Sequence, residues 1–282
     1  MARMNKLPLA KRVQVISALM EGAGVNATVR MTGVSKPTIL KLVADLGTAC
    51  AAYHDKHVRG LKSVRIQCDE IWAFNYCKKV NLAKAKAAPE GAGDCWTWTA
   101  LDADSKLMVT YLVGKRDREC AQDFMDDLGD RLANRVQLTT DGFGAYRNAV
   151  DVTFGNNVDF AQLIKLYSAT PETGPQRRYS PGICTGIRAV PVYGLPDRKH
   201  VSTSFVESHN QKIRQHNRRL TRLTSGHSKK FDNHVHHLSI FFLFYNFARI
   251  HSSLRVTPAM AAGISDHVWT IQDVVLLMDA TR

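Results

Sequence analysis

The sequence predicts an α/β fold in which a mixed sheet of five strands is flanked by helices and preceded by a small all-α segment. Two observations support it. Apolar residues recur at helical spacing over the first 50 residues, whereas from residue 64 onward short apolar runs bounded by turn residues alternate with helical segments. The chain has 282 residues, of which 45% are hydrophobic, which is enough for one sizeable core and a small accessory domain.

Three helices are expected near the N-terminus. Apolar residues at helical spacing predict a helix over residues 9–22, and a second short helix fits residues 26–31. A third helix begins behind the cap residue Ser35, carries Pro37 in its first turn, and runs to Gly47.

The tight turn between the second and third of these helices predicts a helix-turn-helix domain within residues 1–50. The last helix of such a pair can enter the major groove of DNA. Its polar N-terminus would bring Lys36, Thr38 and Lys41 to phosphate groups or base edges. A small helical bundle that binds nothing is the alternative.

The remaining elements define a second domain. A polar linker is expected at 51–63, and a catalytic domain at 64–270 with an irregular insertion rich in Pro, Gly and Arg at about 167–200, before a C-terminal tail at 271–282. The order of three strands, helix, strand, helix and a weaker strand matches the ribonuclease H-like fold. Strands are expected at 64–74, 95–101, 107–113, 136–140 and 159–166, with helices at 119–132 and 144–150.

Three acidic residues stand where a metal-dependent nuclease would need them. Asp69 lies in the first strand, Asp141 ends the fourth, and Glu207 lies in a polar segment with helical spacing. One fold can therefore bring three carboxylates together. Carboxylate oxygens are the hard ligands that suit Mg²⁺ or Mn²⁺.

Each carboxylate also has an alternative explanation. Asp69 adjoins Glu70, and strand alternation sends the two side chains to opposite faces, so either can be the ligand. Asp141 precedes Gly142 and can simply form a turn. Glu207 can be an ordinary exposed helix residue that pairs with Lys or Arg.

The charge distribution favours a polyanionic partner. The formal net charge is +13, and residues 208–230 contain many basic residues and no acidic one. On a helix, Glu207 would share one face with several DNA-contacting side chains. From this region we expect DNA contacts from Asn210, Lys212, Arg214, Arg218, Arg219 and Arg222.

Several segments resemble a known family. CDEIWAF, TTDGFGAY, SFVESHNQKIRQHNRRLTR and YNFARIHSSLRVTPAMAAGI look like the DDE transposases of bacterial insertion sequences, most closely the insertion-sequence-one type, and the resemblance runs from about residue 8 to 275. It implies a catalytic triad of Asp69, Asp141 and Glu207 and so selects Asp69 over its neighbour. It also places the basic residue that follows the family's Glu at Lys212 or Arg214. The zinc-binding module that some relatives carry has no cysteine pair here.

The resemblance implies an enzyme that cleaves and joins double-stranded DNA at element ends and at a target. Two Mg²⁺ or Mn²⁺ ions about 3.5–4 Å apart would serve both steps, with Asp69 bridging them and Asp141 and Glu207 each completing one site. A homodimer or larger assembly on DNA is expected. A ribonuclease H-like nuclease without strand transfer, or a DNA-binding regulator with a degenerate catalytic domain, are the other functions considered.

Composition also bears on location. The six cysteines show no paired spacing, which favours reduced thiols over a disulfide framework or a structural zinc site. The N-terminus lacks the features of a signal peptide, and the longest apolar stretch, 238–247, is about half the length that a membrane span requires. A cytoplasmic protein without membrane contact is expected.

Overall fold

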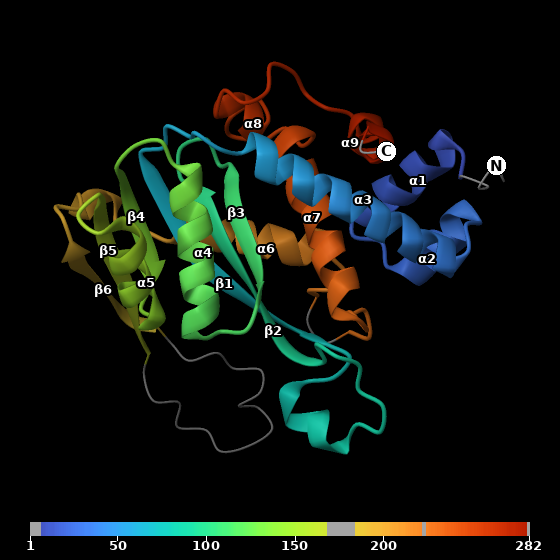
Figure 1. Ribbon diagram of the computed structural model, residues 1–282, viewed down its shortest axis with the longest axis horizontal. Helices are drawn as coiled ribbons and strands as arrows, with labels where there is room; N and C mark the ends of the chain where they lie inside the picture. Colours follow the sequence, from blue (N-terminus) through green and yellow to red (C-terminus); the bar gives the residue numbers. More distant parts are fainter. Residues whose placement is uncertain (1–6, 168–183, 222–223, 281–282) are drawn as a thin grey trace.

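A mixed six-stranded sheet lies at the centre of the computed structural model, which describes residues 7–167, 184–221 and 224–280 (Figure 1). The strand order is β3-β2-β1-β4-β5-β6. Only β1 with β4 and β4 with β5 pair in parallel, while the other neighbours are antiparallel. The strands are β1 (Arg65–Asn75), β2 (Gly93–Asp102), β3 (Met108–Gly114), β4 (Val136–Asp141), β5 (Val158–Tyr167) and β6 (Cys184–Tyr193).

Helices cover both faces of this sheet. On one face, Trp98 of β2 packs against Phe124 of α4 (Arg118–Arg131) and Tyr146 of α5 (Ala145–Phe154). Thr99, the next residue of β2, points the other way and contacts Asn210 of α6 (Ser204–His216). Because successive strand residues face opposite sides, α6 and the α4–α5 pair lie on opposite faces (Figure 1).

The sheet has one strand more than the five predicted. The sixth, β6, lies inside the region predicted as an irregular insertion at 167–200, of which residues 168–183 are outside the described part. Pro191 made this segment an unlikely strand in the sequence, because proline has no backbone N–H to donate to a neighbouring strand. In the structure β6 is an edge strand, and Pro191 pairs with Ala161 beside a bulge, which are the places that tolerate proline.

The N-terminal segment forms three helices, α1 (Leu9–Met20), α2 (Val25–Thr32) and α3 (Lys36–His57). The third is ten residues longer than predicted, so the segment 51–63 predicted as a linker is helical as far as His57. The extension is stabilised by burial, since Cys50 is fully buried and His54 bonds the carbonyl of Met108 in β3 at 3.1 Å. The three helices thus share one hydrophobic core with the sheet.

C-terminal helices complete this shared core. α7 (Phe231–Phe247) packs along α3, and α8 (Pro258–Ala261) follows. Residues 271–280, predicted as part of a tail, form α9 (Ile271–Ala280), which packs on α1 and α3 and pairs Asp279 with Arg12 at 3.1 Å. Two 3₁₀ turns, η1 (Lys79–Lys84) and η3 (Arg198–His200), lie in loops. Among the helices described, none has the length and apolar character needed to cross a membrane.

α3 and α7 approach each other closely at Gly47. A Cβ atom there would lie 2.5 Å from the Cβ of His236 and 2.6 Å from its Cα. An alanine normally gains about 0.5–1 kcal/mol over glycine inside a helix. Here the clash involves backbone and cannot be relieved by a side-chain rotation.

We predict that Gly47→Ala lowers the free energy of unfolding by about 2 kcal/mol, because overpacking outweighs the gain in helix propensity. Gly144→Ala is the matched control, since Gly144 has a φ of −63° and no atom lies within 4 Å of its added Cβ. Urea unfolding followed by circular dichroism measures both. Equal stability of the two variants would contradict the proposed close contact.

Candidate active site

The pairing of β1 with β4 places Asp69 and Asp141 at the same level. Arg65 pairs with Gln137 and Gln67 pairs with Thr139, so paired residues are 72 positions apart in the sequence. Asp69 and Asp141 are separated by the same 72 positions and lie two residues further along their strands. Asp141 thus stands at the carboxyl end of β4, and Asp69 lies beside it in the middle of the longer strand β1. Ligands of open α/β sheets bind at this edge.

Gln67 fastens the start of α6 to the sheet. Its Oε1 atom accepts hydrogen bonds from the backbone N–H groups of Phe205, at 2.9 Å, and Val206, at 3.1 Å. The first N–H groups of a helix have no partner within the helix, so this side chain acts as a cap supplied from β1. Gln67 and Asp69 lie on the same face of the strand, so the helix held by Gln67 also passes over Asp69.

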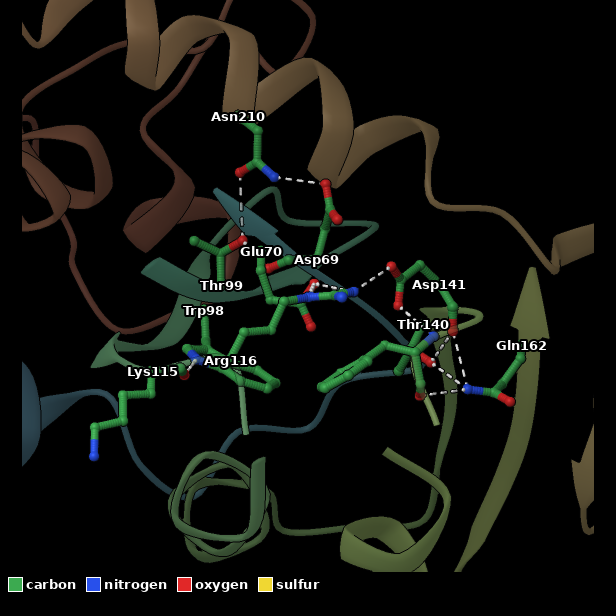
Figure 2. Close-up of polar contacts among 11 residues, drawn as sticks. Asp69, Glu70, Trp98, Thr99, Lys115, Arg116, Thr140, Asp141, Gln162 and Asn210 are labelled. Atoms are coloured by element: carbon green, nitrogen blue, oxygen red, sulfur yellow. Dashed lines mark hydrogen bonds and ion pairs between the residues drawn. The ribbon is translucent and has the colours of Figure 1, made fainter. Parts of the chain in front are cut away.

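Asn210 makes the second attachment of α6. It donates from Nδ2 to Oδ2 of Asp69 at 2.8 Å and accepts from the hydroxyl of Thr99 at 3.3 Å (Figure 2). Glu207 lies one turn earlier on the same helix face. The two attachments therefore place Glu207 on the side of Asp69 and of Asp141 at the end of β4.

Asp69, Asp141 and Glu207 line one pocket of about 490 Å³. Two cationic side chains also line it, Arg116 from the segment after β3 and Lys165 from β5. The Lys165 ammonium pairs with Oε1 of Glu207 at 2.7 Å. The fold thus brings together three carboxylates that are far apart in the sequence.

Glu70 joins this cluster from the opposite face of β1. Carboxylate oxygens of Asp69, Glu70 and Asp141 all lie within 4.8 Å of one another. Arg116 lies between two of them, 3.4 Å from Oε2 of Glu70 and 3.3 Å from Oδ2 of Asp141 (Figure 2). Its guanidinium also lies 3.9 Å from the ring centroid of Phe143, which supports it by a cation–π contact.

Asp141 forms a turn and lines the pocket at once. Its Oδ1 atom accepts from the backbone N–H of Phe143 at 2.9 Å, while Oδ2 faces Arg116. Gln162 of β5 secures this turn by donating to the carbonyls of Asp141 and Phe143 at 3.0 and 3.2 Å (Figure 2). The turn explanation and the ligand explanation for Asp141 are therefore compatible.

Burial and mutual repulsion perturb the carboxylates. Burial raises the pKa of Asp69 to about 6, with a further contribution from the charge of Asp141. Burial likewise raises the pKa of Glu70 to about 7, and Asp141 again adds to it. Both shifts mean that the site holds more negative charge than its surroundings stabilise.

This donor set fits divalent cations. Its ligands are all carboxylate oxygens, which Mg²⁺ and Mn²⁺ prefer. A carboxylate oxygen of Glu70 lies within 4.8 Å of those of Asp69 and Asp141, so one further oxygen donor stands beside them. Strand alternation left open the choice between Asp69 and Glu70. Both approach Asp141, but Asp69 lines the pocket with Glu207, whereas Glu70 lies behind it with a side chain that is 2% exposed.

The DNA-contacting residues expected on α3 are on the surface. Lys36, Thr38 and Lys41 are exposed in its first two turns. Lys41 pairs with Asp45 at 3.0 Å, and Thr38 exchanges a hydrogen bond with the cap residue Ser35. They are accessible to a ligand, and contact with DNA stays a prediction.

The residues expected to contact DNA from α6 differ in placement. Asn210 is buried and positions Asp69, so it is not a surface contact. Arg214 donates to the carbonyls of Trp72 and Leu220, because the helix turns it toward the chain rather than outward. Lys212 lies 3.4 Å from a ring nitrogen of His251, away from the pocket.

Three further residues of this set lie beyond α6, which ends at His216. Arg218 is therefore not on the helix face that the spacing predicted. Arg219 donates to the hydroxyl of Ser228. Arg222 lies outside the described residues.

Sequence reasoning missed the supporting residues of the site. The sequence could have indicated Gln67, because it lies two residues before Asp69 and therefore on the same face of the strand. No comparable signal indicated Arg116, Gln162 or Lys165. Arg116 and Lys165 reach the pocket, and Gln162 holds the turn beside it, only because the segment after β3 and the strand β5 lie next to Asp69 and the end of β4.

Comparison with known proteins gives distant structural matches. No protein-family model and no curated protein sequence matches the chain. A cryo-electron microscopy structure of the piggyBac transposase synaptic complex with hairpin DNA aligns with a TM-score of 0.39 and 10% identity, covering 96% of this chain and 69% of that one. The Mos1 strand transfer complex aligns with a TM-score of 0.25 and 16% identity, over 57% of this chain and 60% of that one. A Mos1 transposase paired-end complex with left transposon end has a TM-score of 0.23 and 14% identity, over 57% and 61%. Such low values assign neither a family nor a function.

We predict that Glu70→Gln stabilises the metal-free protein at pH 8 more than at pH 5, by about 2 kcal/mol. The pKa of Glu70 is about 7 in the folded protein and near 4.3 in the unfolded chain. The folded state therefore binds this proton more tightly, and the resulting stabilisation is lost as the pH rises through 7. Urea unfolding in a chelator at both pH values measures the difference.

Glu90→Gln serves as the control because Glu90 is exposed in the loop before β2. It should change the stability equally at both pH values. If Glu70→Gln behaves like this control, burial does not perturb Glu70 as described.

Proposed function

We propose that this chain is a DDE transposase that binds the ends of a mobile DNA element and catalyses metal-dependent DNA strand cleavage and strand transfer. The observation that carries the proposal is the pocket in which Asp69, Asp141 and Glu207 converge from two parallel strands and a helix. Their sequence contexts also resemble those of the insertion-sequence transposases. A carboxylate pocket on a strongly basic chain is suited to phosphodiester chemistry.

In this proposal Asp69, Asp141 and Glu207 would hold two Mg²⁺ or Mn²⁺ ions, with Glu70 as an additional oxygen donor. When bound, such ions supply Lewis-acid activation of the attacking and leaving oxygens in an in-line displacement at phosphorus. Asn210 would keep Asp69 oriented through its 2.8 Å hydrogen bond. Gln162 would keep Asp141 in place by holding the turn that follows it.

Arg116 and Lys165 would exchange partners when the substrate arrives. Both now pair with pocket carboxylates, which limits repulsion among those groups. Once the carboxylates have cationic ligands, the guanidinium and ammonium groups can pair with a phosphodiester at the same site. The stacking of Arg116 on Phe143 would hold the guanidinium at the pocket during this exchange.

DNA recognition would use other parts of the chain. The helix-turn-helix proposed for residues 1–50 would place Lys36, Thr38 and Lys41 against an element end. Synapsis of two ends would require a dimer or larger assembly. The chain would act in the cytoplasm of a prokaryotic cell, where its DNA is accessible.

We predict that purified protein with Mg²⁺ cleaves duplexes carrying the terminal inverted repeats that flank its gene and joins them to target DNA. Asp141→Asn, Asp69→Asn and Glu207→Gln should each reduce both products about 1,000-fold, since loss of a metal ligand removes several kcal/mol of transition-state stabilisation. Gel analysis of labelled duplexes measures cleavage and joining separately.

Glu90→Gln is the control that changes an exposed carboxylate outside the pocket. Cleavage without joining would replace the proposal by a nuclease, and binding without either reaction by a regulator. Full activity of Asp141→Asn would show that the proposed site is wrong.

A further inference from the structure

A second pocket, a groove of about 560 Å³, lies between the N-terminal helices and the segment that follows α6. One wall comes from residues 23–27 and the first turns of α3, and the other from residues 218–219, residues 225–230 and α7. The contact between the walls is close, since a Cβ atom on Gly24 would lie 3.4 Å from the side chain of Arg218. α6 runs from the sheet toward this region (Figure 1).

The groove is strongly basic. Lys36 contributes from α3, and Arg218, Lys229 and Lys230 contribute from the opposite wall, all of them exposed. Arg219 lines the same groove. None of the described residues that line it is acidic. Basic side chains from two segments about 180 residues apart in the chain thus face one space.

Buried polar groups in this groove lack partners. The Nη2 atom of Arg219 is buried without a hydrogen-bond partner among the described residues, and burial lowers the pKa of this guanidinium to about 10. His237 is only 3% exposed, and neither of its ring nitrogens has a partner in the described part of the chain. A buried polar group without a hydrogen-bond partner destabilises the fold, and more so if it is charged. Burial lowers the pKa of His237, so its ring is neutral and carries one N–H. That N–H and the unpaired N–H groups of Arg219 need acceptor oxygens, which a phosphate group supplies.

We propose that this groove binds the sugar-phosphate backbone of double-stranded DNA. Phosphate oxygens would accept hydrogen bonds from the lysine and arginine side chains of both walls, and the bound strand would join the N-terminal helices to the segment after α6. The identity of the polyanion rests on the proposed function, whereas the groove and its charge do not.

The position of the groove suits DNA that also reaches the carboxylate pocket. Glu207 lies near the start of α6, and the groove begins just past its last residue, His216. At 1.5 Å per residue these points are roughly 14 Å apart. That distance equals about four base-pair steps of B-DNA at 3.4 Å each. The length of α6 between Glu207 and the groove thus corresponds to a short stretch of duplex.

The test is fluorescence anisotropy of a labelled 30-base-pair duplex, titrated at a series of salt concentrations in a chelator so that no cleavage occurs. The double variant Lys36→Gln/Lys230→Gln should bind about tenfold more weakly at low salt, and the slope of log affinity against log salt should become shallower by about 2, since two phosphate contacts are lost. Lys56→Gln is the matched control, because Lys56 is exposed at the far end of α3, roughly 30 Å from Lys36.

An unchanged slope in the double variant, or an equal loss in Lys56→Gln, would overturn the assignment. So would a loss of binding to an acidic peptide or to duplex RNA with DNA binding intact. Circular dichroism melting checks that each variant is folded.

Asp141→Asn separates this proposal from the proposed function. It should retain the wild-type salt slope, because Asp141 lies outside the groove. If it retains DNA cleavage, the proposed active site fails while the groove stands. If the double variant keeps wild-type DNA binding, the groove fails while the active site stands.

Discussion

The short parallel ladder between β1 and β4 is the constraint on which the site depends. It fixes a register in which Asp69 and Asp141, 72 residues apart, reach the same level of the sheet. A slip of one residue would send one carboxylate to the opposite face, because side chains alternate along a strand. The buried apolar residues Ile66 and Leu138, which are partners in this ladder, oppose such a slip.

The polar face of β1 then determines where α6 can lie. Gln67 caps the first turn of the helix, and Asn210 returns a hydrogen bond to Asp69. These buried polar groups stabilise the fold only when paired, because an unpaired one costs about 1–3 kcal/mol. The helix is thereby held in an orientation that directs Glu207 into the pocket. The same contacts therefore hold α6 on the sheet and position the carboxylate of Glu207.

Electrostatics separates two regions of the molecule. The carboxylate pocket concentrates negative charge, balanced by Arg116 and Lys165. The groove at the other end of α6 concentrates positive charge with no acidic residue among its described lining. A polyanion is attracted to the basic groove, whereas it can approach the carboxylate pocket only when bound cations neutralise the carboxylates. In the proposed function, metal ions and DNA would therefore bind to different residues.

The sequence by itself determined the local elements and the three separated carboxylates. Apolar periodicity predicted most strands and helices, since burial of alternate or every third to fourth residue depends only on nearby residues. It missed β6, where Pro191 conceals an edge strand, and it ended α3 too early at Gly47, whose missing side chain instead lets α7 approach. Tertiary structure alone decided that Arg116 and Lys165 line the pocket, that Gln162 holds the turn after Asp141, and that Asn210 supports Asp69. Those contacts join residues far apart in the chain, and only the register of the sheet and the docking of α6 bring them together.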